Sequence, residues 1–211
     1  MSQALSGSTS ASGLTQNERR RQSERALVDA AISIVAESGV GALTFEAIGE
    51  RSGYSRGLVT QRFGSKRGLI DAMIGQLHAE MQSLSAQRGI DALPGLKAIL
   101  SWTELYLREV FRDERLQTYF KLLAASVADN TDLRSAFAQE HERVRIMLAD
   151  LIKKGQAEGG IRTDIDSDAV ATLIGSLQMG ISTQHLVDPA TELEPLLAAA
   201  IDGIYQTLAP A

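Results

Sequence analysis

Apolar residues recur every three or four positions along most of this 211-residue chain, which is the spacing of one face of an α-helix. Between residues 18 and 38 this face comprises Leu27, Ala30, Ala31, Ile34 and Val35. Further stripes with the same spacing lie at 69–81, 96–110, 116–127, 133–151, 170–181 and 193–208. No segment alternates apolar and polar residues as a half-buried strand does. The pattern therefore predicts an all-α protein.

Residues 44 to 66, TFEAIGERSGYSRGLVTQRFGSK, contain the signals that start and stop two short helices. Thr44 can cap a first helix, and Gly53 supplies the left-handed residue that ends it. Ser55 can then cap a second helix. Two short helices around so tight a turn are typical of a helix-turn-helix.

The second of these helices keeps a polar face beside its apolar one. Its polar positions, from which a helix can contact base edges and phosphates, are Arg56, Gly57, Thr60, Gln61 and Arg62. An ordinary helical hairpin with solvated arginines would show the same signals. The segment by itself therefore leaves both interpretations open.

Charge is distributed unevenly along the chain. Residues 1–70 contain nine Lys and Arg against six Asp and Glu, a net charge of +3, and the remainder contains twelve against twenty, a net charge of −8. Arginines at positions 19, 20, 21 and 25 precede the two short helices, and Lys66 and Arg67 follow them. Because binding responds to the local potential within about 10 Å at ordinary salt, the basic end can bind phosphate although the whole chain is acidic.

Composition limits the classes of protein to consider. A hydrophobic content of 44% is typical of a globular protein, and the lack of Cys excludes disulfides and thiolate metal sites. Because no apolar run is long enough to span a bilayer and no signal peptide is recognisable, we expect a cytoplasmic protein with no membrane partner. Residues 1–17, rich in Ser, Gly and Ala, predict a flexible arm. Whether its basic end lies along a DNA groove stays open.

The middle of the chain holds a concentration of aromatic residues, although only 5% of all residues are aromatic. They are Trp102, Tyr106, Tyr119 and Phe120. Such a group is a candidate ligand pocket, but aromatic side chains at helical spacing also form ordinary cores. Gln178 and His185, two helical turns apart, can project into the same pocket. We take these six residues as the candidate effector site.

The last two stripes have more apolar surface than one neighbouring helix can bury. In residues 170–183 a second stripe of mostly small residues would let another helix approach closely, so we expect a homodimer interface here. Both faces can instead be internal core. The interface candidates are Thr172, Gly175, Ser176, Met179, Thr183, Leu193, Leu197, Ile201 and Ile204. A dimer also meets a physical need, because one short recognition helix contacts only a few base pairs.

Motifs of other functional classes are missing from the sequence. His78, His141 and His185 have no partner at metal-ligand spacing, so we predict neither a metal nor a cofactor. No nucleophile elbow, phosphate loop or dinucleotide fingerprint is present. We therefore do not expect an enzyme.

These features together resemble the TetR family of transcriptional regulators over residues 20 to 77. The resemblance rests on a first helix that ends at Gly39, followed by TFEAIGERSGYS and then SRGLVTQRFGSKRGLI. It implies a dimer whose N-terminal domains bind operator DNA and whose larger helical domains enclose a small-molecule pocket. Ligand binding would move the helix from Lys66 to about Arg88 and release the DNA.

Carried over position by position, the resemblance assigns two kinds of DNA contact. Thr44 and Lys66 would contact phosphates. The segment that begins at Ser55 would lie in the major groove, and its groove-facing residues would be Arg56, Gly57, Leu58, Thr60 and Gln61. Thr60 stands where the family usually has Tyr, and Arg62 where it usually has His. These departures leave open which side chains hold the DNA backbone and which contact bases.

The sequence thus predicts a two-domain, all-α, homodimeric regulator that binds double-stranded DNA and is released by a small-molecule effector. The expected divisions are an arm at residues 1–17, a helix-turn-helix domain at 18–65 and an effector-binding and dimerisation domain at 66–211. Repression is the usual mode of regulation in this family. The alternative is a helical module that recognises another protein through its acidic domain, without sequence-specific DNA binding.

Overall fold

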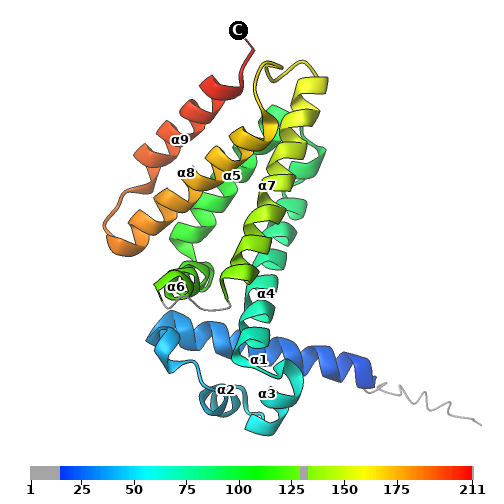
Figure 1. The fold of residues 1–211 in the computed structure, drawn as a ribbon, viewed down its shortest axis with the longest axis vertical. Helices are drawn as coiled ribbons and strands as arrows, with labels where there is room; N and C mark the ends of the chain where they lie inside the picture. The colour runs from blue at the N-terminus through cyan, green and yellow to red at the C-terminus, as the bar shows by residue number, and fades with distance from the viewer. Residues whose placement is uncertain (1–14, 129–132, 211) are drawn as a thin grey trace, which may run out of the picture.

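The computed structural model describes residues 15–128 and 133–210, and within these ranges the chain is helical with no strand (Figure 1). The α-helices are α1 (Gln16–Ser38), α2 (Phe45–Ser52), α3 (Arg56–Phe63), α4 (Lys66–Gln87), α5 (Gly95–Arg112), α6 (Glu114–Ala128), α7 (Arg134–Ala157), α8 (Ser167–Val187) and α9 (Leu193–Leu208). Short 3₁₀ turns η1 (Val40–Ala42) and η2 (Ile90–Ala92) follow α1 and α4. None of the described helices is both long and apolar enough to cross a bilayer. The predicted all-α fold is confirmed.

Helix α1 begins earlier than the sequence predicts. The Thr15 backbone N–H donates to the Glu18 carboxylate at 2.6 Å, and the Thr15 hydroxyl accepts from the Glu18 backbone N–H at 3.3 Å. This capping box fixes the first turn of the helix. Residues 15–17, predicted to belong to the arm, therefore form the cap and the start of α1. The rest of the predicted arm, residues 1–14, lies outside the described residues.

Helices α1, α2 and α3 form a small head at one end of the molecule (Figure 1). Leu27, Ile48 and Val59, one from each helix, are completely buried, because each lies on the apolar face that its helix turns toward the other two. Arg51 of α2 donates to both carboxylate oxygens of Glu37 at 2.6 Å, which ties α2 to the end of α1. The head is thus a compact three-helix unit.

Helix α4 begins in the head and runs into the larger body formed by α5 to α9 (Figure 1). Helix α7 packs against α5 and α8, and α9 packs against α5. The apolar core continues from the head along α4 into the body. The Ser65 hydroxyl caps α4 by accepting from the Gly68 backbone N–H at 3.1 Å, so the predicted division at residue 65 coincides with a helix start. That division into domains stays a prediction.

Polar contacts between α1, α4 and α6 join the head to the body. Arg115 of α6 donates to Asp29 of α1 at 2.7 Å and lies 3.3 Å from Glu80 of α4. Gln76 of α4 donates to the same two carboxylates, at 2.7 and 3.1 Å. The Lys121 ammonium of α6 donates to the Ala36 carbonyl near the end of α1 at 2.6 Å. The orientation of the head therefore depends on the positions of α4 and α6.

Candidate DNA interface and ligand cavity

Helix α3 is fixed at its start and left open along its outer face. The Ser55 hydroxyl accepts from the Leu58 backbone N–H at 3.2 Å, and Gly53 before it adopts the left-handed conformation, with φ +76°. The Thr44 hydroxyl caps α2 in the same way, accepting from Ala47 at 3.1 Å. Among the predicted DNA contacts, the exposed residues are Thr44, Ser55, Arg56, Gly57, Thr60, Gln61 and Lys66. These residues are therefore accessible to a duplex.

Arg56 at the head of α3 forms an exposed ion pair with Glu46 of α2, at 2.9 Å. Because both side chains are well solvated, the pair contributes little to stability, and the guanidinium can turn to another acceptor at small cost. The Thr60 hydroxyl donates to the Arg56 carbonyl at 3.2 Å. The Thr60 hydroxyl is therefore held against the backbone of α3.

Arg62 lies on a different side of α3 from the one that the sequence analysis assigned to it. It is partly buried, and its guanidinium donates to the Ser23 hydroxyl of α1 at 3.4 Å. The physical reason is helical register, because position 62 is one turn from the buried Val59 and faces the same neighbour. Leu58 is also partly buried and packs against the apolar core of the head. Arg62 therefore braces α3 against α1 in this structure.

A polar cleft between the first turns of α1 and α3 contains residues that were not predicted to contact DNA. Arg19, Arg20 and Tyr54 line it together with Gln61 and Arg62. Tyr54, in the turn before α3, is an exposed large aromatic residue. In the sequence, Tyr54 stands directly before Ser55, which caps α3, and this position indicates that Tyr54 lies close to the DNA-binding helix. The fold thus brings the basic cluster of α1 next to the candidate reading helix.

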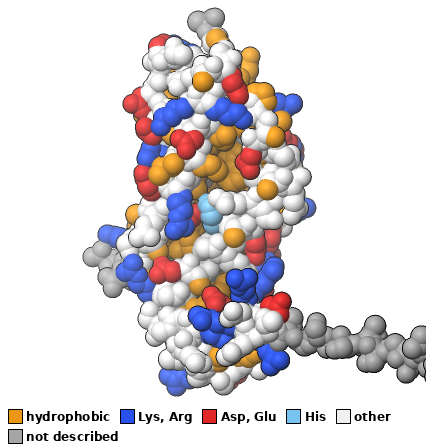
Figure 2. Space-filling model, turned by 90° about the vertical axis from the view of Figure 1, so that its right-hand side faces the viewer, with side chains coloured by type: hydrophobic (Ala, Val, Ile, Leu, Met, Phe, Trp, Pro, Cys, Tyr) orange, Lys and Arg blue, Asp and Glu red, His pale blue; other side chains and the backbone are white. Residues whose placement is uncertain are grey.

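The body contains a cavity of about 290 Å³ between α4, α5, α6, α7 and α8. Figure 2 shows apolar side chains at the floor of a hollow in the body, with charged side chains around its rim. Five of the predicted effector residues line the cavity, namely Trp102, Tyr106, Tyr119, Phe120 and Gln178. Helix α4 contributes the apolar Ile74, Leu77 and Met81. The structure therefore brings the aromatic residues together at a cavity that touches the linking helix.

Glu140 of α7 is the most deeply buried charged group in the wall of this cavity, with only 4% of its surface exposed. One of its carboxylate oxygens contacts His78 Nδ1 of α4, and the other accepts from Arg143 at 2.8 Å. Burial raises the pKa of the Glu140 carboxyl, but His78 and Arg143 lower it by more, so its net pKa lies below the ordinary value. The His78 contact joins α4 to α7 through the wall of the cavity.

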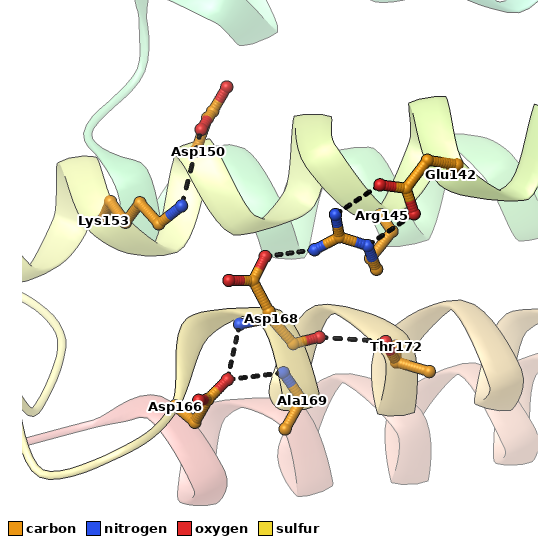
Figure 3. A network of polar contacts seen from close by, with 8 residues as sticks. All are labelled: Glu142, Arg145, Asp150, Lys153, Asp166, Asp168, Ala169 and Thr172. Carbon is orange, nitrogen blue, oxygen red and sulfur yellow. Dashed lines mark hydrogen bonds and ion pairs between the residues drawn. The ribbon is translucent and has the colours of Figure 1, made fainter.

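A second ionic group lies at the side of the cavity, between α7 and α8 (Figure 3). Arg145 of α7 donates to both oxygens of Glu142 and also contacts Asp168 of α8. The Asp166 carboxylate caps α8 by accepting from the backbone N–H groups of Asp168 and Ala169, at 2.9 and 2.8 Å. Arg145 therefore holds the first turn of α8 against α7 beside the cavity.

His185 does not line the cavity, in contrast to the sequence prediction. Its ring stacks on Phe111 of α5, with centroids 3.9 Å apart, and its Nε2 lies 3.5 Å from the Gln117 side-chain nitrogen. Two turns along α8 separate His185 from Gln178, and at the level of His185 the helix packs against Phe111 and Gln117, neither of which lines the cavity. His185 is therefore part of the packing at that end of the body.

The outer faces of α8 and α9 include large apolar residues in contact with solvent. Leu173 and Leu177 of α8 are 60% and 38% exposed, and Tyr205 of α9 is 45% exposed. Of the interface candidates, Thr172, Ser176 and Thr183 are exposed, and Gly175, Met179, Leu193 and Ile201 are partly buried. Leu197 and Ile204 are buried against α5 and its neighbours inside this chain, so these two predictions are wrong.

Comparisons with known proteins assign the chain to a family. Residues 27–73, from the middle of α1 to the first turns of α4, match the family described as bacterial regulatory proteins, tetR family. Residues 100–206, half of the chain, match the family described as BetI-type transcriptional repressor, C-terminal. The chain belongs to the TetR family. It is therefore a DNA-binding transcriptional regulator, as the sequence predicts.

Individual transcriptional regulators are similar to this chain along most of its length. The HTH-type transcriptional regulator BetI of Rhizobium meliloti is 27% identical over 184 residues, which cover 86% of this chain and 75% of BetI. A TetR-family regulator structure from Rhodococcus sp. superposes with a TM-score of 0.79 at 20% identity, covering 90% of this chain and all of that one. A transcriptional regulator from Saccharomonospora viridis, solved in complex with choline, gives a TM-score of 0.69 at 18% identity, covering 90% and 100%.

Several cavity residues of this TetR-family chain were missing from the sequence prediction. They are His78, Glu140, His141, Glu142 and Arg145. A signal for two of them existed, because positions 137, 140, 141 and 144 recur at helical spacing and place Glu140 and His141 among core-facing residues. No sequence signal pairs Glu140 with His78, since the two residues belong to helices that meet only in the folded body.

Arg56→Ala is expected to weaken operator binding by about 1–3 kcal/mol and to relax the preference at one base pair, because an exposed guanidinium at the head of α3 can pair with guanine. The measurement is a binding array of operator variants at fixed salt. Lys66→Ala is the matched control, because a lysine that contacts phosphate should weaken binding to all sequences alike and reduce the salt slope by about one. Uniform weakening by Arg56→Ala would assign Arg56 to the DNA backbone instead.

Glu140→Gln is expected to lower stability at neutral pH and to flatten the acid limb of the stability profile. Because the folded-state pKa of Glu140 lies below its unfolded value, its contribution is present above about pH 4.5 and is lost as the pH falls through the folded pKa. At pH 7 the substitution should cost about 1.5–3 kcal/mol, the range for hydrogen bonds to a charged group. Urea unfolding between about pH 2.5 and 8 measures both effects.

The matched control for this prediction is Glu142→Gln, which removes a half-exposed carboxylate, two residues from Glu140 in α7. Its effect at neutral pH should be much smaller, because exposed ion pairs contribute little. Parallel profiles for the wild type and Glu140→Gln below pH 5 would contradict the assigned role of Glu140.

Proposed function

We propose that this TetR-family chain binds an operator as a homodimer, usually to repress, and that a small molecule in the body cavity releases it. One observation carries the proposal, namely that α4 lines the cavity on one side and supports the head on the other. Ile74, Leu77 and His78 lie in the cavity wall, and Gln76 and Glu80 hold Arg115 and α1.

Release follows from this double role of α4. A ligand that spreads the cavity wall moves α4, and Gln76 and Glu80 then move relative to Asp29 and Arg115. Since the head is held by these contacts, its angle to the body changes and two heads no longer match one face of a duplex. Ligand binding can change the head angle only if the ligand binds one position of α4 more tightly than the other. Because α4 forms part of the cavity wall, a shift of α4 changes the cavity and hence the affinity for the ligand.

A second copy is expected to cover the exposed apolar side chains of α8 and α9. Leu173, Leu177 and Tyr205 would be buried there. The predicted interface residues Thr172, Gly175, Ser176 and Met179 line the body cavity on the neighbouring side of α8. Two heads on a two-fold axis then bind two half-sites, which supplies the specificity that a single short helix lacks.

The regulator would act without catalysis, in the compartment that holds its operator, which in a bacterium is the cytoplasm. The proposal is tested by fluorescence anisotropy with the DNA upstream of its own coding region, in the presence of excess nonspecific competitor. Specific binding that falls steeply with salt, and a stoichiometry of two chains per site, is the expected result. Binding of equal strength to unrelated DNA would overturn the proposal.

A further inference from the structure

The polar cleft between the first turns of α1 and α3 carries positive charge without a carboxylate in its wall. Three of its lining residues are arginines, namely Arg19 and Arg20 of α1 and Arg62 of α3, and no described residue that lines it is Asp or Glu. The chain before α1 can supply no acid either, because residues 1–17 contain no Asp or Glu. The carboxylate of Glu18, the first acid in the sequence, caps the start of α1. The cleft is therefore a local concentration of positive charge.

Arg62 is partly buried in this wall and has no counter-charge. No carboxylate of the described residues pairs with its guanidinium, and its Nε is buried without a hydrogen-bond partner among them. Its Nη2 donates to the Ser23 hydroxyl at 3.4 Å, which is longer than the usual range of about 2.7–3.2 Å. Because Ser23 also lines the cleft, this end of the guanidinium lies at the cleft. A guanidinium that loses water without gaining an anion is unfavourable, and an anion bound in the cleft would offset that cost.

Further hydrogen-bond donors complete the wall. Arg20 is exposed and forms no ion pair with a described residue. Tyr54 contributes a hydroxyl from the turn before α3, and Gln61 contributes an amide from α3 itself. A phosphate group presents charged oxygen acceptors that match the donors of a guanidinium in geometry and in charge. The cleft therefore has the donors that a phosphate requires.

The position of the cleft indicates which phosphate reaches it. Leu58 and Gln61 line the cleft, and both are among the residues predicted to face the major groove. A helix in the major groove has the sugar-phosphate backbones of the two strands at its flanks. With α3 in the groove, a cleft beside these residues would lie against one of the two backbones.

We infer that the cleft binds one backbone phosphate of the operator between Arg20 of α1 and Arg62 of α3, with the Tyr54 hydroxyl as a further donor. The inference rests on the proposed function and adds a DNA contact from α1 to it. Arg62 then holds the DNA backbone and does not contact a base. Helix α1 also carries Asp29, which side chains of α4 and α6 contact, so a movement of the head would displace this phosphate contact together with α3.

The test replaces the operator phosphates one at a time by neutral methylphosphonate linkages and measures affinity by fluorescence anisotropy. At one position per half-site, the replacement is expected to weaken binding of the wild type about 5-fold or more. The same replacement should have a smaller effect on Arg20→Gln and on Arg62→Gln, and little effect on the variant with both substitutions, because the partners of that phosphate are then missing. Arg62→Gln should leave the preference for bases unchanged in an array of operator variants.

Arg25→Gln is the matched control, since Arg25 is exposed on the same helix but does not line the cleft. It removes the same charge and should keep the full loss at that phosphate. The inference would be overturned if no phosphate depended on Arg62, if Arg20 and Arg62 depended on different phosphates, or if Arg25 behaved as Arg20 does. Because Arg20 is exposed, its variant tests the site even if Arg62→Gln fails to fold.

Inorganic phosphate distinguishes a site for the DNA backbone from a site for a free anion. At constant ionic strength, replacing chloride by inorganic phosphate is expected to leave operator binding of the wild type and of the double variant equally affected. Stronger competition against the wild type would mean that the cleft binds free phosphate, and it would overturn the assignment to DNA.

The salt dependence of binding to an unrelated duplex separates this inference from the proposed function. Phosphate contacts also form with nonspecific DNA, so the double variant should lower the slope of log K against log salt by about one for each bound head. A lower slope without any preference for the operator would refute the regulator and leave the phosphate site standing. A specific operator complex in which no phosphate depends on Arg62 would refute only the phosphate site.

Discussion

Aspartate at both Leu173 and Leu177 is expected to separate the dimer and to weaken operator binding at least a hundredfold. The two leucines are 60% and 38% exposed on one face of α8, so the substitutions leave the chain's own core intact. In a dimer they would place four carboxylates in one apolar interface, where desolvation and repulsion both oppose association. Monomers then bind half-sites independently and lose the high effective concentration of the second head.

Sedimentation velocity measures the oligomeric state, and anisotropy at fixed salt measures operator affinity. Val127→Asp is the matched control, since Val127 is 58% exposed and lies on α6, which carries none of the proposed interface residues. It should leave both quantities unchanged. If the double variant remained a dimer with wild-type affinity, the interface would have to lie on another face of the body.

Gly95→Ala is expected to destabilise the body by about 3 kcal/mol, because overpacking here displaces backbone rather than a flexible side chain. A Cβ atom on Gly95 would lie 2.3 Å from the Gly155 nitrogen and 2.4 Å from the Leu151 carbonyl oxygen of α7. Helices α5 and α7 would have to move apart, and both form walls of the cavity. Thermal unfolding should show a loss of about 6–12 °C for a chain of this size.

Gly75→Ala is the control for this experiment. Gly75 is exposed on α4, and a Cβ atom there would meet no other atom within 4 Å. Because alanine has the higher helix propensity, the substitution should stabilise the protein by about 0.5–1 kcal/mol. A tolerated Gly95→Ala would mean that α5 and α7 do not cross as closely as the structure has them.

Local signals account for the parts of the fold that were predicted correctly. Thr44, Ser55 and Ser65 each accept from a backbone N–H three residues ahead, and Gly53 adopts the left-handed conformation that ends α2. These interactions connect residues within one turn, so their spacing in the sequence is sufficient evidence for them. The start of α1 was placed too late, although Thr15 and Glu18 already carry the capping-box spacing.

Composition and periodicity also predicted that the aromatic residues would gather, and five of the six effector candidates line one cavity. Composition and periodicity did not show which residues of α8 face the cavity. His185 stacks on Phe111 outside the cavity. In α9 the apolar residues Leu197 and Ile204 are buried in the chain's own core, while on α8 Leu173 and Leu177 are left exposed. An apolar stripe indicates that one face of a helix is buried, but it does not show whether residues of the same chain or of a partner bury it.

By itself, the sequence determined the helices, their caps, the helix-turn-helix and the basic end of the chain, because these depend on neighbours within a few residues or on composition. Only the tertiary structure decided that Arg62 packs on Ser23 of α1, that Glu140 pairs with His78, and that the Trp102 N–H is buried without a hydrogen-bond partner in the part of the chain that the structure describes. Each of these facts depends on how two helices distant in the sequence rotate and approach one another. Packing of the whole core sets that rotation, and no short stretch of sequence specifies it.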